Sequence, residues 1–419
     1  MFVNLSKNIK VKILEILLFL VGFSIPFSKV FNSICLALLF LFSFLWANKK
    51  YYKNFISSSN SIFVLFLLFF LIQFFGVFYS ENLNLALDNI KKSSVILILI
   101  ISFYNIKEII DYNKVTISIL GLILGVFTIL ISAHTNILSK IFSEDLPMSS
   151  LITNFTRVDF VKEAIVEVHP PYLGMLIVFI LVPVTKLFLF KKKIFNFICI
   201  LFILSYLLLS LYEVSSLMSL FLLVVLIFLI TILLLIKNKW KTLFSLFLVL
   251  TFLSNFFLSF IETKKVSEFG GGSLVNKIDW VFFKEKGDTS RPHNWKSVIK
   301  VFKKNIFFGV GNDGGILQLQ SNRDKNSESY INKHNAHNQY LEIILRHGIV
   351  GSIIYIFLLM TIVVKSIRSN NIIFLWFIIV FLISSLTESY LQRQIGLVFF
   401  TFFSILFSIN KTITKYTVK

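Results

Sequence analysis

The sequence predicts an all-α polytopic membrane protein with about 12 transmembrane helices. Of its 419 residues, 56% are hydrophobic and only 15% are charged, whereas about a quarter of the residues in an ordinary soluble domain are charged. Apolar runs long enough to cross a bilayer, which takes about 20 residues, recur along the chain. This composition excludes a soluble enzyme, and 50 Phe residues exclude an intrinsically disordered chain.

The first apolar run follows a short basic stretch with Lys7, Lys10 and Lys12, as in the n-region of a signal peptide. No small-residue cleavage site follows it and a second apolar run begins at once, so we expect an uncleaved first helix. Hydropathy predicts transmembrane helices at roughly residues 13–29, 31–48, 60–79, 93–106, 115–134, 171–190, 195–212, 214–236, 242–261, 349–365, 371–387 and 395–410.

Lysine is concentrated in alternate connections between these apolar runs. By the positive-inside rule, we expect these connections and both termini to face the cytoplasm. The other connections would then face outward: short turns near 30, 80–92, 213 and 388–394, a loop at about 135–170, and a long segment at about 262–345. Most of the net charge of +20 is therefore an orientation signal and does not indicate binding of nucleic acid.

This layout divides the chain into three expected parts. Residues 1–261 would form transmembrane helices 1–9 with a modest loop at about 135–170, and residues 262–348 a large outward loop domain. Residues 349–419 would form helices 10–12 and a cytoplasmic tail. Cys35 and Cys199 lie in apolar runs, so we interpret them as small core residues and not as a disulfide or metal ligands.

Histidine and arginine are distributed unlike lysine. All six His and five of the six Arg lie in segments expected to face outward, while Lys supplies nearly all the cytoplasmic charge. The planar guanidinium of Arg binds phosphate or carboxylate through two parallel hydrogen bonds, whereas Lys acts as a point charge. This pattern favours a protein that handles a phosphorylated or carboxylated ligand outside. For any single Arg, anchoring at the membrane interface is an equal alternative.

The densest group of polar residues runs from His334 to Gly351. It would hold an imidazole at the mouth of a membrane helix, where it could act as a general base toward a substrate hydroxyl. Gly348 and Gly351 would let the chain turn and allow close helix approach. A metal site at His334 and His337 is the alternative, but this pair lacks a convincing third ligand nearby. Helical periodicity places Leu341, Ile344 and Leu345 on one face and Asn338, Glu342 and Arg346 on another.

A second group begins with Arg291 and Trp295 and continues to Gly309-Val310-Gly311. The paired glycines invite comparison with a phosphate-binding loop. That interpretation is weak because a preceding strand and the remaining glycines are missing. We therefore expect a tight turn at this position.

Two further groups lie near helix ends on the outer side. His169 and the prolines after it open a helix at the membrane surface, following a loop that contains Arg157. Proline is well suited to the first turn of a helix. Glu388 and Arg393 lie between the last two helices, where this group could equally form a helix cap.

These pieces, in this order, resemble the O-antigen ligase and O-antigen polymerase superfamily, the lipid-linked oligosaccharide transferases of the bacterial envelope. The ligase pattern of His, Asn, nine residues, Gly, two residues and Gly is met by residues 337–351. Arg291 and Trp295, followed by Gly309-Val310-Gly311, are similar to an element of the family's large periplasmic loop. The segments at His169 and Glu388 look similar, though less specifically.

The resemblance implies a fold of the glycosyltransferase C type with a periplasmic active site in the bacterial inner membrane. It implies transfer of a glycan from undecaprenyl diphosphate to an acceptor hydroxyl, on lipid A-core or a growing glycan, without a metal or nucleotide cofactor. His337 would accept the proton, and Arg291 and Arg157 would bind the diphosphate. Supporting residues would be Asn338, His334, Trp295, His169, Glu388, Arg393, Gly348 and Gly351.

The sequence departs from the family at one position. Ligases carry an Arg in a short loop before the eighth helix, but this chain reads Tyr212-Glu213-Val214-Ser215-Ser216 there. Either another Arg replaces it or the diphosphate is bound differently.

Four functions remain open on the sequence alone. Ligation of O-antigen to lipid A-core leads, because one outward loop is long and the other modest, whereas polymerases tend to have two substantial loops. A repeat-unit polymerase and a protein O-oligosaccharyltransferase are the enzymatic alternatives. A polysaccharide transporter or flippase is the alternative of another class, favoured by the number of helices. Against it, transport pathways are marked by ionisable residues within the membrane, and the middles of these helices contain almost none.

Overall fold

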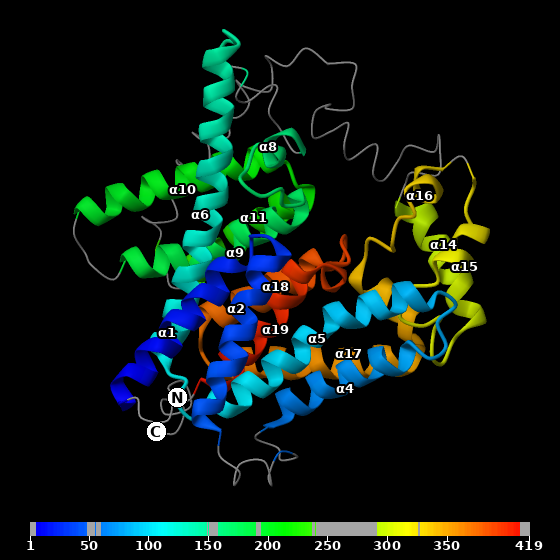
Figure 1. Ribbon diagram of the computed structural model, residues 1–419. Coiled ribbons are helices and arrows are strands. Elements are labelled where there is room, and N and C mark those ends of the chain that lie inside the picture. Colours follow the sequence, from blue (N-terminus) through cyan, green and yellow to red (C-terminus); the bar gives the residue numbers. More distant parts are fainter. Residues whose placement is uncertain are drawn as a thin grey trace.

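The computed structural model describes residues 6–47, 55, 60–148, 150, 158–189, 194–236, 239, 291–325 and 327–410 (Figure 1). Every regular element within these ranges is an α-helix or a short 3-10 helix, as the sequence predicts. The long helices are α1 (Lys7–Ser24), α2 (Lys29–Ser43), α4 (Ser61–Gly76), α5 (Leu83–Ile106), α6 (Tyr112–Ser143), α9 (Pro170–Leu189), α10 (Ile194–Val214), α11 (Leu217–Ile236), α17 (Gln339–Arg368), α18 (Ile372–Ser384) and α19 (Gln394–Ile409).

Short helices connect or flank these long ones. They are η1 (Phe44–Trp46), α8 (Val158–Lys162), α14 (Arg291–Lys304), α15 (Ile316–Ser321), α16 (Glu328–Ile331) and η4 (Tyr390–Gln392). Each predicted apolar segment overlaps a long helix, except 242–261, which lies outside the described residues. Most of the predicted large loop, up to residue 290, also lies outside them.

Within the described residues, 4 helical stretches are long and apolar enough to cross a membrane. They are Lys29–Trp46, Tyr112–Ser143, Leu217–Ile236 and Gln339–Arg368, and shorter apolar helices accompany them. The chain is therefore a multi-pass membrane protein. The total of about 12 spans remains a prediction.

Polar caps extend two helices beyond their apolar stretches. The Asn82 side chain accepts a hydrogen bond from the Leu85 amide at the start of α5, and the Asn338 side chain accepts from Tyr340 and Leu341 at the start of α17. Such caps satisfy amide groups that have no partner within the helix. Both helices consequently begin about ten residues before the apolar stretch that hydropathy identifies.

Glycines allow α1 and α6 to lie in close contact. A Cβ atom on Gly22 would lie 2.2 Å from the Ser118 carbonyl oxygen, and one on Gly121 would lie 2.2 Å from the Phe19 carbonyl oxygen. Small residues at helix interfaces in membranes permit this close approach of backbones. The first helix is thereby fixed against the rest of the bundle.

α19 lies inside the bundle and packs through aromatic rings (Figure 1). Phe399 lies 5.3 Å from Phe179 of α9 and 5.2 Å from Phe377 of α18, measured between ring centroids. Phe402 lies 5.4 Å from Phe103 of α5. These contacts fix the start of α19, and with it the connection from residue 385 to 393, against three neighbouring helices.

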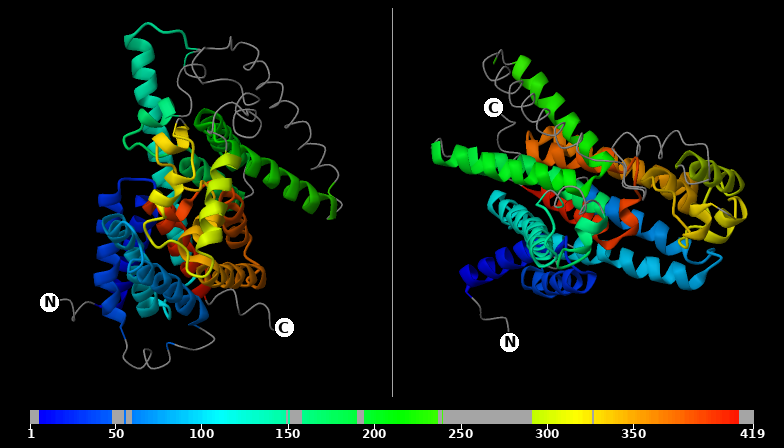
Figure 2. Two further views of the ribbon diagram at one scale, coloured as in Figure 1. Left: turned by 90° about the vertical axis from the view of Figure 1, so that its right-hand side faces the viewer. Right: turned by 90° about the horizontal axis from the view of Figure 1, so that it is seen from above.

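The helices α14, α15 and α16 gather at one end of the bundle, beside the ends of α4, α5 and α17 (Figures 1 and 2). Their small apolar core consists of Val298, Val301, Val310, Leu319, Ala336 and Leu345. The Asn312 amide donates to the Gly76 carbonyl at the end of α4, at 3.1 Å. This is the end of the bundle that the lysine distribution predicts to face outward.

Candidate functional site

The candidate site is centred on His337, directly before the first turn of α17. The Asn338 side-chain oxygen caps that turn by accepting from Tyr340 at 2.9 Å and Leu341 at 3.0 Å. Its amide nitrogen donates to the Leu386 carbonyl at 2.9 Å, which ties the cap to the connection between α18 and α19. His337 has a φ of 45°, a left-handed conformation that is rare for residues other than glycine and tends to occur at functional sites.

The imidazole of His337 faces the carboxylate of Glu388. Nδ1 of His337 lies 3.3 Å from each carboxylate oxygen of Glu388. The His337 side chain is 27% exposed, whereas that of Glu388 is 7% exposed. The sequence singled out both residues in separate motifs, and the structure brings them together.

Burial alone would raise the pKa of Glu388. The hydrogen bond and charge of His337, followed by the charge of His169 and the Ser389 amide, outweigh that effect and lower this pKa overall. Glu388 is therefore ionised near neutrality, and an ionised carboxylate can only accept hydrogen bonds. The alternative role of Glu388 as a cap of α19 is not seen, because α19 has no side-chain cap.

The loop that carries His334 and His337 is held through its backbone carbonyls. Trp295 Nε1 donates to the Ala336 carbonyl at 2.9 Å, and Arg323 donates to the His334 carbonyl at 2.8 Å. Burial lowers the pKa of Arg323 to about 10, which leaves it charged at neutral pH. Trp295 and Arg323 thus set the backbone on which His337 lies, although sequence reasoning gave Arg323 no role.

The His334 and His337 rings lie 5.0 Å apart between centroids, in an edge-to-face arrangement. The sequence suggested a metal site here as an alternative. In the part of the chain that the structure describes, no group of three or more His, Cys, Asp or Glu residues is placed to hold a metal ion. His334 is half-buried and its ring packs against that of His337.

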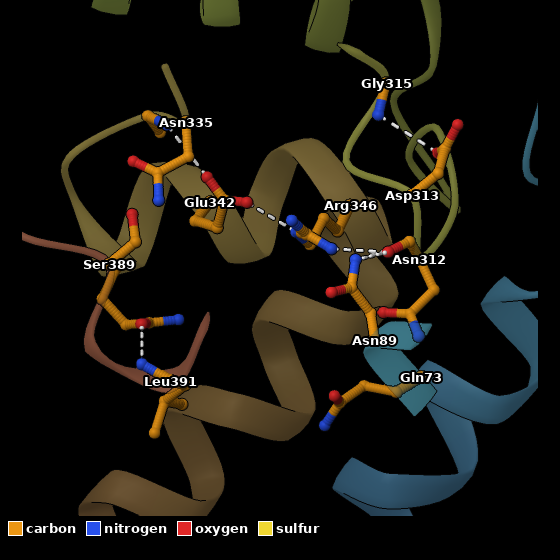
Figure 3. A network of polar contacts seen from close by, with 12 residues as sticks. Gln73, Asn89, Asn312, Asp313, Gly315, Asn335, Glu342, Arg346, Ser389 and Leu391 are labelled. Carbon is orange, nitrogen blue, oxygen red and sulfur yellow. Dashed lines mark hydrogen bonds and ion pairs between the residues drawn. The ribbon is translucent and has the colours of Figure 1, made fainter. Parts of the chain in front are cut away.

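A buried ion pair lies behind the His337 loop (Figure 3). Arg346 Nε donates to Glu342 Oε1 at 2.5 Å, and the other carboxylate oxygen accepts from the Ala336 amide at 3.0 Å. Arg346 also donates to the Asn312 carbonyl at 2.5 Å, which accepts from Asn89 of α5 as well. The polar face predicted for this helix therefore connects the His337 loop to α5.

The segment Gly309-Val310-Gly311 lies between turns at 306–308 and 312–313, with φ of 72° at Gly309 and 100° at Gly311. The amides of Val310 and Gly311 donate to the Leu345 and Arg346 carbonyls, at 3.0 Å each. These amides are consequently occupied and do not form a cradle for a phosphate.

Gly348 interrupts α17 with a φ of 59° and a ψ of -156°. A Cβ atom there would lie 2.4 Å from the Phe307 carbonyl oxygen, so the turn expected at this glycine is confirmed. Gly351 is close-packed too, because its Cβ atom would lie 2.2 Å from Cβ of His347.

The first turn of α9 joins the site through two tyrosine hydrogen bonds. Tyr172 donates to the Ser389 carbonyl at 3.2 Å, and Tyr390 donates to the Pro171 carbonyl at 3.0 Å. Arg393 lies 5.7 Å from the centroid of the Tyr172 ring. His169 and Arg393, predicted from separate motifs, therefore lie near the connection that carries Glu388.

Of the two arginines predicted to bind diphosphate, Arg291 lies within the described residues and Arg157 does not. Arg291 is the first residue of α14 and is partly buried. Burial and the charge of Glu388 raise the pKa of Tyr390, and the charge of Arg291 lowers it in part. The charge of Arg291 therefore reaches Tyr390 of the connection that carries Glu388.

At the position where the family's Arg was expected, Glu213 of α10 is fully buried and faces α6. Its Oε2 atom lies 2.8 Å from Nε2 of His134. This contact is an ion pair when the imidazole is protonated. Sequence reasoning missed this second His and Glu pair.

Residues 199–356 match the family model of O-antigen ligase. The match supports the O-antigen ligase superfamily for this part of the chain. The matched range contains His337, Arg291, Trp295 and both Gly348 and Gly351, so the resemblance stated from the motifs is confirmed. No curated protein matches the chain.

Proposed function

We propose that the protein is a membrane glycosyltransferase that ligates O-antigen to lipid A-core on the periplasmic face. It would take the glycan from undecaprenyl diphosphate and transfer it to an acceptor hydroxyl. The observation that carries this proposal is the His337 and Glu388 pair, at 3.3 Å, at the start of α17 within an O-antigen ligase segment. The partly exposed imidazole of His337 lies at the end of the bundle predicted to face outward.

The pair supports the assignment of one nitrogen of His337 as the base. An ionised Glu388 can only accept, so Nδ1 of a neutral His337 carries the proton and Nε2 keeps its lone pair. Nε2 then removes the proton from the acceptor hydroxyl. The oxygen forms a bond to the anomeric carbon of the glycan, and the bond from that carbon to the diphosphate oxygen breaks. General base catalysis of this kind contributes roughly 10²–10⁴-fold to a rate.

The departing diphosphate takes the electron pair of the broken bond and gains negative charge. Fixed cations at the place where this charge develops stabilise the transition state. Arg291 and Arg157 are proposed for this role.

The proposed location is the bacterial inner membrane, with both termini cytoplasmic. In this arrangement residues 1–261 and 349–419 are membrane parts, and 262–348 is the periplasmic loop domain that carries the His337 motif. The polar residues of the His337 site lie at one end of the apolar bundle, which supports a reaction at an interface over passage through the bilayer.

A complementation experiment tests the proposal. A strain that lacks the gene receives wild-type protein or His337→Ala at equal protein level, and its lipopolysaccharide ladder is examined. We expect no ladder with His337→Ala, together with accumulation of lipid-linked polymer. An unchanged ladder contradicts the proposal, and single capped repeats in the strain lacking the gene assign the protein as a polymerase instead.

A second measurement distinguishes a glycosyltransferase from a transporter. Purified protein in liposomes, without an ion gradient, receives a lipid-linked glycan and an acceptor. We expect transfer of the glycan to the acceptor. Movement of the lipid-linked glycan across the bilayer with no transfer would show a flippase.

A further inference from the structure

A cavity of about 140 Å³ lies next to the His337 site, where the ends of α1, α2, α9 and α19 meet. Lys29, His169 and Arg393 contribute basic side chains to its lining, and Glu167 contributes an exposed acidic one. A water molecule occupies about 30 Å³ in the liquid, so the cavity has room for a phosphate group with some water.

The charge around the cavity is predominantly positive. Lys29 and Arg393 are both exposed. Burial, and then the positive charges of Lys29, Arg346 and Arg393, lower the pKa of Lys92, which precedes the apolar part of α5. Of these cations, Arg346 is already neutralised by Glu342. Lys29 and Arg393 line the cavity, and their charges reach Lys92, which lines a separate pocket.

Two long helices also begin at this cavity. α2 starts at Lys29 and α19 starts at Gln394, and α19 has no side-chain cap at its first turn. The N-terminal end of a helix carries partial positive charge and favours anions. The helix ends therefore add to the attraction that the Lys29 and Arg393 side chains exert.

The floor of the cavity is polar and ordered. The Gln394 side chain is buried and donates to Asn32 Oδ1 and Ser33 Oγ, at 3.0 Å each. Asn32 in turn donates to Ser24 Oγ at 3.0 Å. This network ties the start of α19 to α1 and α2, and with it Arg393 and Lys29, which both line the cavity.

The cavity is close to the proposed catalytic pair. Arg393 faces the ring of Tyr172, and the Tyr172 hydroxyl donates to the Ser389 carbonyl, one residue after Glu388. The charge of His169, which lines the cavity, also acts on Glu388. Two residues that line the cavity, His169 and Arg393, are therefore linked to the connection that carries Glu388.

We propose that this cavity binds a phosphate of a lipid substrate, with Lys29 and Arg393 as the binding cations. Under the proposed function, this phosphate is part of the diphosphate of the lipid-linked donor. This assignment rests on the proposed function. Lys29 and Arg393 would replace the Arg that ligases carry in the loop near Ser215. An anionic phospholipid headgroup offers the same chemistry from a different source.

Binding to a catalytically inactive protein tests the site without relying on turnover. Full-length His337→Ala protein in zwitterionic liposomes is titrated with undecaprenyl diphosphate, with and without Lys29→Gln and Arg393→Gln. We expect the Kd to rise about tenfold for each substitution, as for loss of a charged hydrogen-bond partner. Lys91→Gln is the matched control, because Lys91 is 75% exposed and pairs with Asp88 away from the cavity. An unchanged Kd in the doubly substituted protein overturns the proposal.

Turnover measurements in the protein with an intact His337 separate the two sources. We expect the KM for the lipid-linked donor to rise about tenfold in Lys29→Gln. If a phospholipid fills the site, KM stays constant and stimulation by phosphatidylglycerol is lost instead, which overturns the assignment to the donor. If wild-type protein transfers no glycan although undecaprenyl diphosphate binds as described, the proposed function fails while the phosphate site stands.

Discussion

The chain contains two His and Glu pairs with different access to solvent. In the pair at the start of α17, the His337 side chain is 27% exposed and lies 3.3 Å from Glu388. In the pair between α6 and α10, His134 is 12% exposed and lies 2.8 Å from a fully buried Glu213. The same two residue types are thus available for chemistry in one place and enclosed in the other.

The surroundings explain the difference. His134 lies between the rings of Phe160 and Tyr206, at 5.1 and 5.2 Å, and its Nδ1 atom is 2.8 Å from the Leu130 carbonyl. In the described part of the chain, hydrogen bonds engage only Nδ1 and the backbone amide of His337. The pair of His337 and Glu388 is therefore more accessible to a substrate hydroxyl than the pair of His134 and Glu213.

The largest effect on stability is expected at the enclosed pair. Glu213→Ala leaves His134 buried without its partner, and removing one member of a buried ion pair costs about 3–5 kcal/mol. Thermal unfolding in detergent should show this loss, while the transfer rate per folded molecule stays close to that of wild type. A normal unfolding temperature combined with loss of transfer would reverse the roles of the two pairs.

At the accessible pair, Glu388→Gln should lower the transfer rate roughly tenfold or more, because the amide no longer fixes the proton on Nδ1 of His337. Initial rates in liposomes measure this change. Glu388→Asp, which keeps the charge, should recover part of the rate. Equal rates for wild type and Glu388→Gln would show that the carboxylate has no part in orienting the base.

The same carboxylate gives a pH signature for stability. Since the pKa of Glu388 is lowered on folding from its ordinary 4.5, the pair stabilises the folded state fully above about pH 4.5. This contribution is lost as the pH falls through the lowered folded pKa. The difference in unfolding temperature between wild type and Glu388→Gln should therefore shrink below pH 4.5, and a difference that grows there would contradict the assignment.

A smaller effect is expected at the cap that positions His337. Asn338→Ala removes the oxygen that accepts from Tyr340 and Leu341, and loss of such a cap costs about 1 kcal/mol. Asn338→Ser keeps a capping oxygen and should lose less. Unfolding in detergent measures both variants, and identical stability of Asn338→Ala and wild type would show that the cap does not hold this turn.

The sequence predicted the helices well because hydropathy is local. The apolar run of α6 can be read without knowing any neighbour, whereas the caps at Asn82 and Asn338, which start two helices about ten residues earlier, were not predicted. His337 and Glu388 were also identified as candidates, but their contact was not, since it depends on how α17, α18 and α19 pack together. Arg323 was missed because it acts on backbone carbonyls, which leave no motif.

The pairing of His134 with Glu213 could not be predicted for a related reason. Helices that are apolar on nearly all sides, such as α10, give little indication of which face meets a neighbour. Two ionisable residues far apart in sequence can then face each other inside the bundle without any sign in the periodicity.

Glycan transfer by two histidine variants tests the central claim most directly. Purified His337→Ala and His134→Ala are reconstituted in the same liposomes with a lipid-linked donor and a lipid A-core acceptor, and initial rates are expressed per folded molecule. We expect His337→Ala to lose about 10²-fold or more, the usual contribution of a general base, and His134→Ala to stay within about threefold of wild type, within the spread of indirect effects. Full transfer by His337→Ala, or loss of transfer confined to His134→Ala, would contradict the account.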